Sequence, residues 1–188
     1  MENLVTEPAL QYHQVSPKAY LAGEIKASEK HEYFEGTVIK MQGASLIHED
    51  IVANLVREIR IQLKGKDCRI RGSNLRVAPP DFLSYMYPDA TIGCGTPLIS
   101  ADEFDVLQNP TIIFEVVSPS GAGNDYRRKW LYYRQIPSLK QYVLISSYEK
   151  MQIDLYIKNV HGTWIFQSLL APDQILEFSS FFQTKHLN

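Results

Sequence analysis

Cysteine is scarce in this chain, which has two in 188 residues, Cys68 and Cys94. They form no CxxC pair and stand far apart in the sequence, which argues against a structural zinc site and against a disulfide framework. A cysteine without such a partner usually packs as a small apolar side chain. We therefore predict two buried free thiols.

Long hydrophobic runs are also missing. No apolar stretch approaches the roughly 20 residues that are needed to span a bilayer. Residues 1–13 contain acids and no early basic cluster, so they lack the pattern of a secretory signal. These absences predict a cytoplasmic protein with no membrane partner.

An excess of positive charge is lacking too, because 19 Lys and Arg residues stand against 21 Asp and Glu residues. A net charge of −2 does not by itself indicate a nucleic-acid binder, since phosphate contacts need local Lys and Arg. Bases do gather at 64–76 and at 127–134. A near-neutral enzyme can still present its bases on one face. The Walker, GxGxxG, HExxH and GxSxG motifs are absent.

The patterns that are present predict one α/β domain over residues 14–188, after a flexible arm at 1–13. An N-terminal hairpin at 31–41 turns at Glu35-Gly36. We expect helices at 17–22, from Ser45 to Gly65, and at 124–135. We expect further strands at 68–71, 74–78, 88–92, 111–117, 142–146, 152–157 and 163–168, with a loop at 93–110.

A carboxylate interrupts the most apolar of these strands. Residues 111–117 are apolar and rich in β-branched side chains except for Glu115, which is the pattern of a central strand covered on both faces. Burying an unpaired charge is costly, so Glu115 needs either a metal ion or a partner within the core. The residue alone leaves both roles open.

Asp89 follows Pro88 at the start of another apolar strand. Two carboxylates on neighbouring strands can converge on a hard cation, and Mg²⁺ typically takes one or two carboxylates together with waters and substrate phosphate. An acid after a turn is also a common way for a strand to begin. Asp89 and Glu115 together favour the metal site.

Lys129 is the third candidate. It falls on one helical stripe with Asp125, Tyr132, Tyr133 and Ile136, among aromatic rather than solvated residues. The helix directly follows the strand of Glu115, so the ammonium could reach the carboxylates, orient an attacking water and offset charge on phosphate oxygens. The alternative is a surface lysine paired with Asp125.

A resemblance adds to this pattern. The chain carries Tyr33-Phe34-Glu35-Gly36, His48, Pro88-Asp89, the stretch Phe114-Glu-Val-Val-Ser-Pro-Ser120, and then Asp125, Lys129 and Tyr133. With these residues, from about Ser16 to about Gln167, it resembles the Uma-two family of restriction-endonuclease-like proteins with the PD-(D/E)XK core.

The resemblance implies an α/β fold with a restriction-endonuclease-like core, a mixed β-sheet flanked by helices, and the hairpin as an N-terminal extension. It implies that Asp89 and Glu115 bind Mg²⁺ or Mn²⁺, with the carbonyl of Val116 as a third ligand. It also implies DNA as substrate and a homodimer. Val117 occupies the position of the superfamily's usual lysine, so the resemblance assigns that amine to Lys129.

Three further residues match the family pattern. Glu35 lies at the hairpin turn, where exposed acids are common, and the resemblance lets it approach the metal site. His48 projects from the apolar face of its helix, so it is either a core histidine or a site residue. Tyr133 is expected in the core, with a hydrogen bond into the site as the alternative.

We predict an endonuclease that hydrolyses phosphodiester bonds in DNA, with Asp89 and Glu115 holding the metal and Lys129 orienting the water. Two alternatives stay open. The chain could be a non-catalytic binding module for nucleic acid or protein that keeps the nuclease fold, as Val117 and the low net charge suggest. Glu115 could instead belong to a structural ion pair, with the acids never converging.

Overall fold

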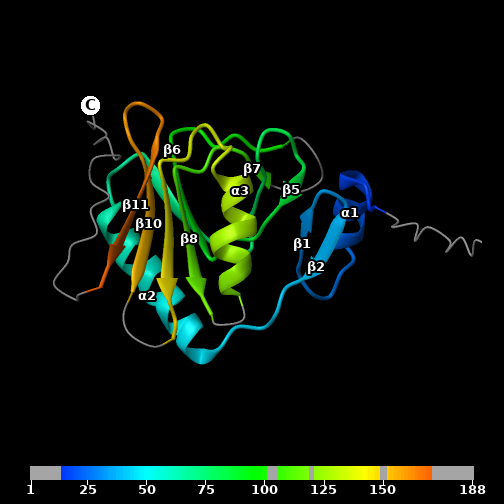
Figure 1. Ribbon diagram of the computed structural model, residues 1–188, viewed down its shortest axis with the longest axis horizontal. Coiled ribbons are helices and arrows are strands. Elements are labelled where there is room, and N and C mark those ends of the chain that lie inside the picture. The colour runs from blue at the N-terminus through cyan, green and yellow to red at the C-terminus, as the bar shows by residue number, and fades with distance from the viewer. Residues whose placement is uncertain (1–13, 101–105, 119–120, 149–151, 171–188) are drawn as a thin grey trace, which may run out of the picture.

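A computed structural model describes residues 14–100, 106–118, 121–148 and 152–170 (Figure 1). The predicted arm at 1–13 lies outside these residues. Six strands form the central sheet in the order β11-β10-β9-β8-β6-β3. They are β3 (Cys68–Gly72), β6 (Ala90–Cys94), β8 (Ile112–Val117), β9 (Gln141–Ser146), β10 (Ile153–Lys158) and β11 (Trp164–Leu169). The β8–β9 pair is parallel and the other pairs are antiparallel, which confirms the predicted mixed sheet.

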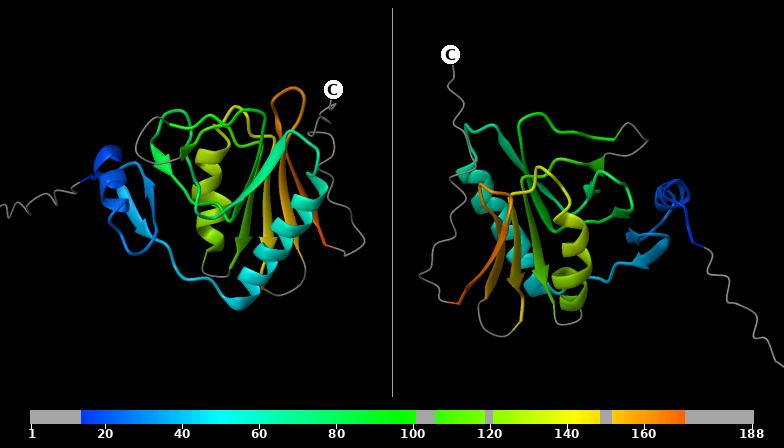
Figure 2. Two further views of the ribbon diagram at one scale, coloured as in Figure 1. Left: turned by 180° about the vertical axis from the view of Figure 1, so that it is seen from behind. Right: turned by 45° about the horizontal axis from the view of Figure 1, so that its top comes forward.

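Strand β8 is buried along its whole length, as its apolar run predicts. Its side chains alternate between two cores. Ile113 and Val117 pack with Tyr133, whereas Ile112 and Phe114 pack with residues of α2 (Leu46–Gln62). The helix pair η1 (Asn124–Lys129) and α3 (Trp130–Tyr133) therefore covers one face of the sheet and α2 covers the other, as the front and back views show (Figures 1 and 2).

The helix after β8 differs from its prediction. The segment Asn124–Lys129 is π-helical, and the α-helix follows only from Trp130 to Tyr133. A π-turn widens the helix by one residue per turn, and such turns are frequent at functional sites. Propensity and periodicity predict helix but do not separate these two forms. Both Asp125 and Lys129 are buried within this segment.

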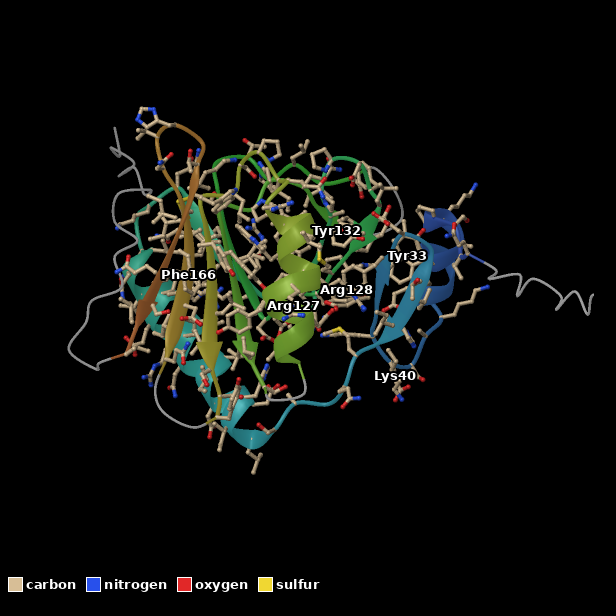
Figure 3. The ribbon with its side chains drawn as sticks, viewed as in Figure 1. Tyr33, Lys40, Arg127, Arg128, Tyr132 and Phe166 are labelled. Carbon is tan, nitrogen blue, oxygen red and sulfur yellow. A yellow bond between two sulfur atoms is a disulfide. The ribbon has the colours of Figure 1, made fainter. Side chains whose placement is uncertain are left out.

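The N-terminal region packs beside this helix. It contains α1 (Pro17–Glu24), β1 (His31–Phe34), β2 (Thr37–Lys40) and β5 (Ser84–Tyr85), with the strands in the order β2-β1-β5. The hairpin turns where predicted, since Glu35 and Gly36 have φ angles of 46° and 95°. Phe34 packs against Tyr132 of α3 at 5.4 Å between ring centroids, and Arg128 lies 5.4 Å from the centroid of the Phe34 ring. Figure 3 shows Arg128 and Tyr132 in the region between the helix and the hairpin.

The expected loop at 93–110 contains a strand. Strand β7 (Val106–Leu107) pairs in parallel with β4 (Arg76–Val77), and both residues of β7 are fully buried. Two residues are too few to show a periodic pattern, and for that reason the sequence predicts a loop. β4 is also shorter than the expected strand at 74–78.

The prediction of two free thiols is wrong. Cys68 on β3 lies directly opposite Cys94 on β6, and the two form a disulfide across the strand pair. Separation along the chain does not keep them apart, because the antiparallel register brings the ends of the two strands together. Among the residues that the structure describes, no helix is both long enough and apolar enough to cross a membrane.

Candidate active site

A buried ion cluster lies between β8, η1 and the N-terminal hairpin. The Lys129 ammonium is 3.0 Å from Glu115 Oε1, 3.1 Å from Glu32 Oε1 and 3.3 Å from Asp125 Oδ1. Lys129 is 5% exposed and Glu115 is 3% exposed. Lys129 is thus neither a surface residue nor paired with Asp125 alone. Three carboxylates share one ammonium inside the protein.

The local structure explains how these side chains meet. Glu115 is on the β8 face that η1 and α3 cover, while Asp125 and Lys129 are one turn apart on η1. Glu32 comes from β1, where it shares a strand face with Phe34 because strand side chains alternate with a period of two. The contact of Phe34 with the helix therefore also directs Glu32 inward. The Tyr87 amide and the Asn124 side chain donate hydrogen bonds to the Glu32 carboxylate, at 3.2 and 3.3 Å.

The cluster holds more negative than positive charge. Burial raises the pKa of Glu115 well above its usual range; Lys129 opposes this, and the charges of Asp125, Asp89 and Glu32 add to it. Burial likewise raises the pKa of Asp125. Burial disfavours the charged form of Lys129, but the three surrounding carboxylates outweigh it and raise the lysine pKa well above its ordinary value. Lys129 therefore stays protonated, and it is the carboxylates that lack sufficient counter-charge.

Asp89 lies at the next position along the sheet. The last ladder pair between β6 and β8 is Ala90 with Phe114, so Asp89 falls opposite Glu115 just beyond it. Asp89 Oδ2 accepts a hydrogen bond of 2.7 Å from the Val116 amide and lies 3.1 Å from His48 Nε2. Among the described residues, no donor reaches Asp89 Oδ1 or Glu115 Oε2. Each acid therefore keeps one oxygen that a further ligand could use.

His48 belongs to this site rather than to the apolar core. It lies at the first turn of α2, where neighbouring Ile47 is 60% exposed, so this end of the predicted apolar face is not packed against the sheet. The hydrogen bond to Asp89 raises the pKa of His48, partly offset by burial. The contact with His48 holds the Asp89 carboxylate in place, and protonation of the imidazole would partly neutralise it.

Tyr133 is fully buried, as expected of a core residue, and it also makes the hydrogen bond into the site that stood as the alternative. Its hydroxyl donates to Glu115 Oε1 at 3.0 Å, and burial raises the pKa of Tyr133 well above its usual range, so the phenol stays protonated and acts as a donor. Tyr142 on β9 similarly donates to the backbone carbonyl of Asp125 at 2.9 Å. Both tyrosines fix the acids that surround Lys129.

The hairpin acid expected at the site is replaced by another. Glu35 is in the exposed turn beside Tyr132, and it contacts none of the residues around Lys129. The buried acid is Glu32, three residues earlier, which the sequence analysis did not identify. The strand period was the available signal, because it places Glu32 on the same face as apolar Phe34. A turn residue such as Glu35 belongs to neither strand face.

The donor set suits a hard divalent cation. Carboxylate oxygens are the ligands that Mg²⁺ and Mn²⁺ prefer, and a site with one or two carboxylates completed by waters is usual for Mg²⁺. The described residues contain no group of three or more His, Cys, Asp or Glu side chains arranged to hold a metal ion. The Lys129 ammonium lies at the centre of three of the acids, and Asp89 lies at the edge of this cluster, opposite Glu115 in the strand register.

Comparison with known proteins agrees with this architecture. A family model described as Uma2, putative restriction endonuclease, matches residues 12–187. The uncharacterized protein slr1290 of Synechocystis sp. (strain PCC 6803) is 33% identical over 89% of this chain and 87% of its own length. A second protein of that organism, sll1609, is 32% identical over 85% of this chain and 90% of its own length.

A solved structure shares the fold. It is a crystal structure described as a putative nuclease belonging to DUF820, from Anabaena variabilis, with a TM-score of 0.71 at 19% identity over 92% of this chain and 94% of that chain. At this identity the likeness shows the fold alone, which is restriction-endonuclease-like. Because the family model spans nearly all of the sequence, this chain belongs to the Uma2, or Uma-two, family of restriction-endonuclease-like proteins.

Proposed function

We propose that this protein is a metal-dependent endonuclease that hydrolyses phosphodiester bonds in DNA. The observation that carries the proposal is the buried cluster at the end of β8, where Glu32, Glu115 and Asp125 surround Lys129 and Asp89 lies alongside. Burying charges in this way costs several kcal/mol per ion, and a catalytic function would explain why the chain keeps them. Hydrophobic side chains would pack this position at lower cost.

Each residue has a distinct role in the proposal. Asp89 and Glu115 would hold Mg²⁺ or Mn²⁺, with the Val116 carbonyl as the third protein ligand. Bound there, the ion would lower the pKa of a water and offset negative charge on the phosphate. Lys129 would orient the attacking water and Glu32 would hold the lysine in place. His48 and Tyr133 would fix the two ligand carboxylates through their hydrogen bonds.

Plasmid nicking tests this proposal. Supercoiled DNA is incubated with each variant in Mg²⁺, in Mn²⁺ and in EDTA. We expect metal-dependent nicking by the wild type, and a loss of about 100-fold or more for Asp89→Asn, Glu115→Gln and Lys129→Met. Equal nicking by all four proteins would identify a contaminating nuclease and remove the proposal.

The hairpin offers a matched pair of variants. Glu32→Gln and Glu35→Gln make the same chemical change three residues apart. We expect Glu32→Gln to lower nicking at least tenfold, because it loosens Lys129, and Glu35→Gln to leave the rate unchanged. If Glu35→Gln alone were impaired, the hairpin would contribute through its turn, and the role given to Glu32 would fall.

A non-catalytic binding module is the second candidate. One observation favours it, because the ammonium of Lys129 is already engaged by three carboxylates and Val117 stands at the usual lysine position. Calorimetry with Mn²⁺ and nicking assays separate the two proposals. Metal binding that Glu115→Gln abolishes, without cleavage of DNA or RNA, would favour the binding module. The homodimer is also a proposal, which light scattering of the purified protein tests.

A further inference from the structure

Positive charge is concentrated in the last third of the described chain. Residues 121–170 contain seven Lys and Arg residues but three acids, although the whole chain has a net charge of −2. Two of those acids, Asp125 and Asp154, are described, and both are buried. Asp125 contacts Lys129, and Asp154 accepts hydrogen bonds from Tyr126, Gln152 and Ser168. The described outer surface of this region therefore presents basic side chains without acidic ones.

Aromatic side chains line the same region. Tyr156 on β10 lies opposite Phe166 on β11, and Lys158 lies opposite Trp164, so these four side chains share one sheet face. Trp130 of α3 stacks on Tyr156 with ring centroids 4.0 Å apart and meets Trp164 edge-on at 4.8 Å. We call Trp130, Tyr156, Trp164 and Phe166 the aromatic shelf. Phe166 is 54% exposed, and the other three rings are partly exposed.

Basic side chains lie near the aromatic shelf. Lys158 lies 5.5 Å from the centroid of the Trp164 ring. Arg127 and Arg134 are exposed and lie one turn before and one turn after Trp130, on the same side of the helix. Figure 3 shows Phe166 over the outer strands and Arg127 over the neighbouring helix. A face that combines an exposed ring with guanidinium and ammonium groups matches a chain of phosphates that carries stackable nucleobases.

We propose that the aromatic shelf binds single-stranded nucleic acid, with Phe166 and Trp164 stacking on bases and Arg127, Arg134 and Lys158 contacting phosphates. The inference deepens the proposed nuclease function by naming a surface that would hold an unpaired part of the substrate. A single strand fits better than a duplex, because base faces are available for stacking only when they are unpaired. Charge complementarity distinguishes this occupant from a second copy of the chain, whose matching face would repel it.

The shelf is joined to the candidate active site through one helix. Tyr126, between Asp125 and Arg127 on η1, donates a hydrogen bond to Asp154 on β10, next to the shelf residues of that strand. Lys129 and Asp125 are on the same π-helical segment. A strand held on the shelf would thus lie beside the element that carries two residues of the ion cluster.

Fluorescence anisotropy with a labelled 20-nucleotide oligo(dT) tests this inference, with a duplex of equal length as comparison. Binding is measured in EDTA with the full chain, so it does not depend on cleavage. We expect Phe166→Ala to raise the Kd for oligo(dT) about fivefold to 100-fold, and Phe166→Trp to restore binding. We expect Arg127→Gln with Lys158→Gln to make the plot of log K against log salt less steep, reducing the magnitude of its negative slope by about 1.4. Each lost phosphate contact contributes about 0.7. Lys18→Gln with Lys64→Gln removes the same charge from exposed positions elsewhere and should change neither value.

Three results would overturn the inference: no oligo(dT) binding at low salt, binding that Phe166→Ala leaves unchanged, or an equal loss in the Lys18 and Lys64 control. If Phe166→Ala changed the oligomeric state in solution and left DNA binding intact, the shelf would instead be assigned to contacts between copies of the chain. The Glu115→Gln variant separates this inference from the proposed function, because it should lose nicking and keep oligo(dT) binding. Normal oligo(dT) binding by a wild type that shows no nicking would refute nuclease activity and leave the shelf standing.

Discussion

Replacing Lys129 with Met should destabilise the protein strongly, because it leaves three buried carboxylates without their shared cation. Methionine has a similar length and apolar stem, so the change removes charge rather than volume. At an effective dielectric constant of about 20, a charge pair about 4 Å apart is worth about 4 kcal/mol. The Lys129 ammonium takes part in three such contacts, at 3.0, 3.1 and 3.3 Å between N and O atoms.

Relaxation reduces this gross value. The acids can take up protons, and the variant no longer has an ammonium to desolvate, so both effects offset part of the lost attraction. We therefore expect the free energy of unfolding to fall by the amount typical of breaking a buried ion pair, about 3–5 kcal/mol at pH 8. For a chain of this length that corresponds to a fall in Tm of about 6–20 °C. Urea unfolding in EDTA measures it. Lys64→Met, at an exposed position, is the control and should change stability by less than about 0.5 kcal/mol.

The pH dependence has a definite sign. Without Lys129, the pKa of Glu115, which burial already raises, rises further, so the folded variant binds a proton that the unfolded chain has released. Stability of the variant relative to the wild type therefore falls as pH increases, and the deficit should be smaller at pH 5.5 than at pH 8. Adding Glu115→Gln should recover about 1–3 kcal/mol in a double-mutant cycle. A deficit below about 1 kcal/mol at pH 8, or one independent of pH, would refute this account of the cluster.

The remaining predictions concern neighbouring contacts. The hydrogen bond to Asp89 raises the pKa of His48 in the folded protein. The extra stability of the wild type over His48→Gln should therefore be complete below about pH 6.5 and disappear as pH rises through the folded pKa. A difference in the free energy of urea unfolding that stays constant with pH would contradict this. Tyr133→Phe should cost about 1–3 kcal/mol in urea unfolding, because it removes a donor to buried Glu115, and no cost would show that the bond is unimportant. Reducing the Cys68–Cys94 disulfide should cost about 3 kcal/mol, read as a lower Tm in dithiothreitol, whereas an unchanged Tm and two titratable thiols before reduction would show that the bond is absent in solution.

Much of the fold could be predicted from patterns that depend on local chemistry. The apolar run around Glu115 identified the central strand, Ser45 marked the start of α2, and the Glu35-Gly36 turn located the hairpin. These signals work because burial period and capping are properties of short segments. The same patterns missed β7, which has two residues, and the π-helical segment, whose composition resembles that of an α-helix.

Contacts between distant segments were harder to predict. The sequence placed Glu115 and Lys129 near each other because the helix directly follows the strand. It did not identify Glu32, whose inward direction depends on how Phe34 docks on α3. It also missed the Cys68–Cys94 bond, since strand register rather than sequence spacing brings these residues together. Such positions are set by tertiary packing, which no short window of sequence contains.

The central claim is that Asp89 and Glu115 share a divalent cation beside Lys129. Anomalous diffraction from crystals soaked in Mn²⁺ tests it most directly. We predict one peak within coordination distance of a carboxylate oxygen from each of the two acids, and no peak in crystals of Glu115→Gln. A wild-type crystal with no peak there at saturating Mn²⁺, or with the ion bound elsewhere, would contradict the claim.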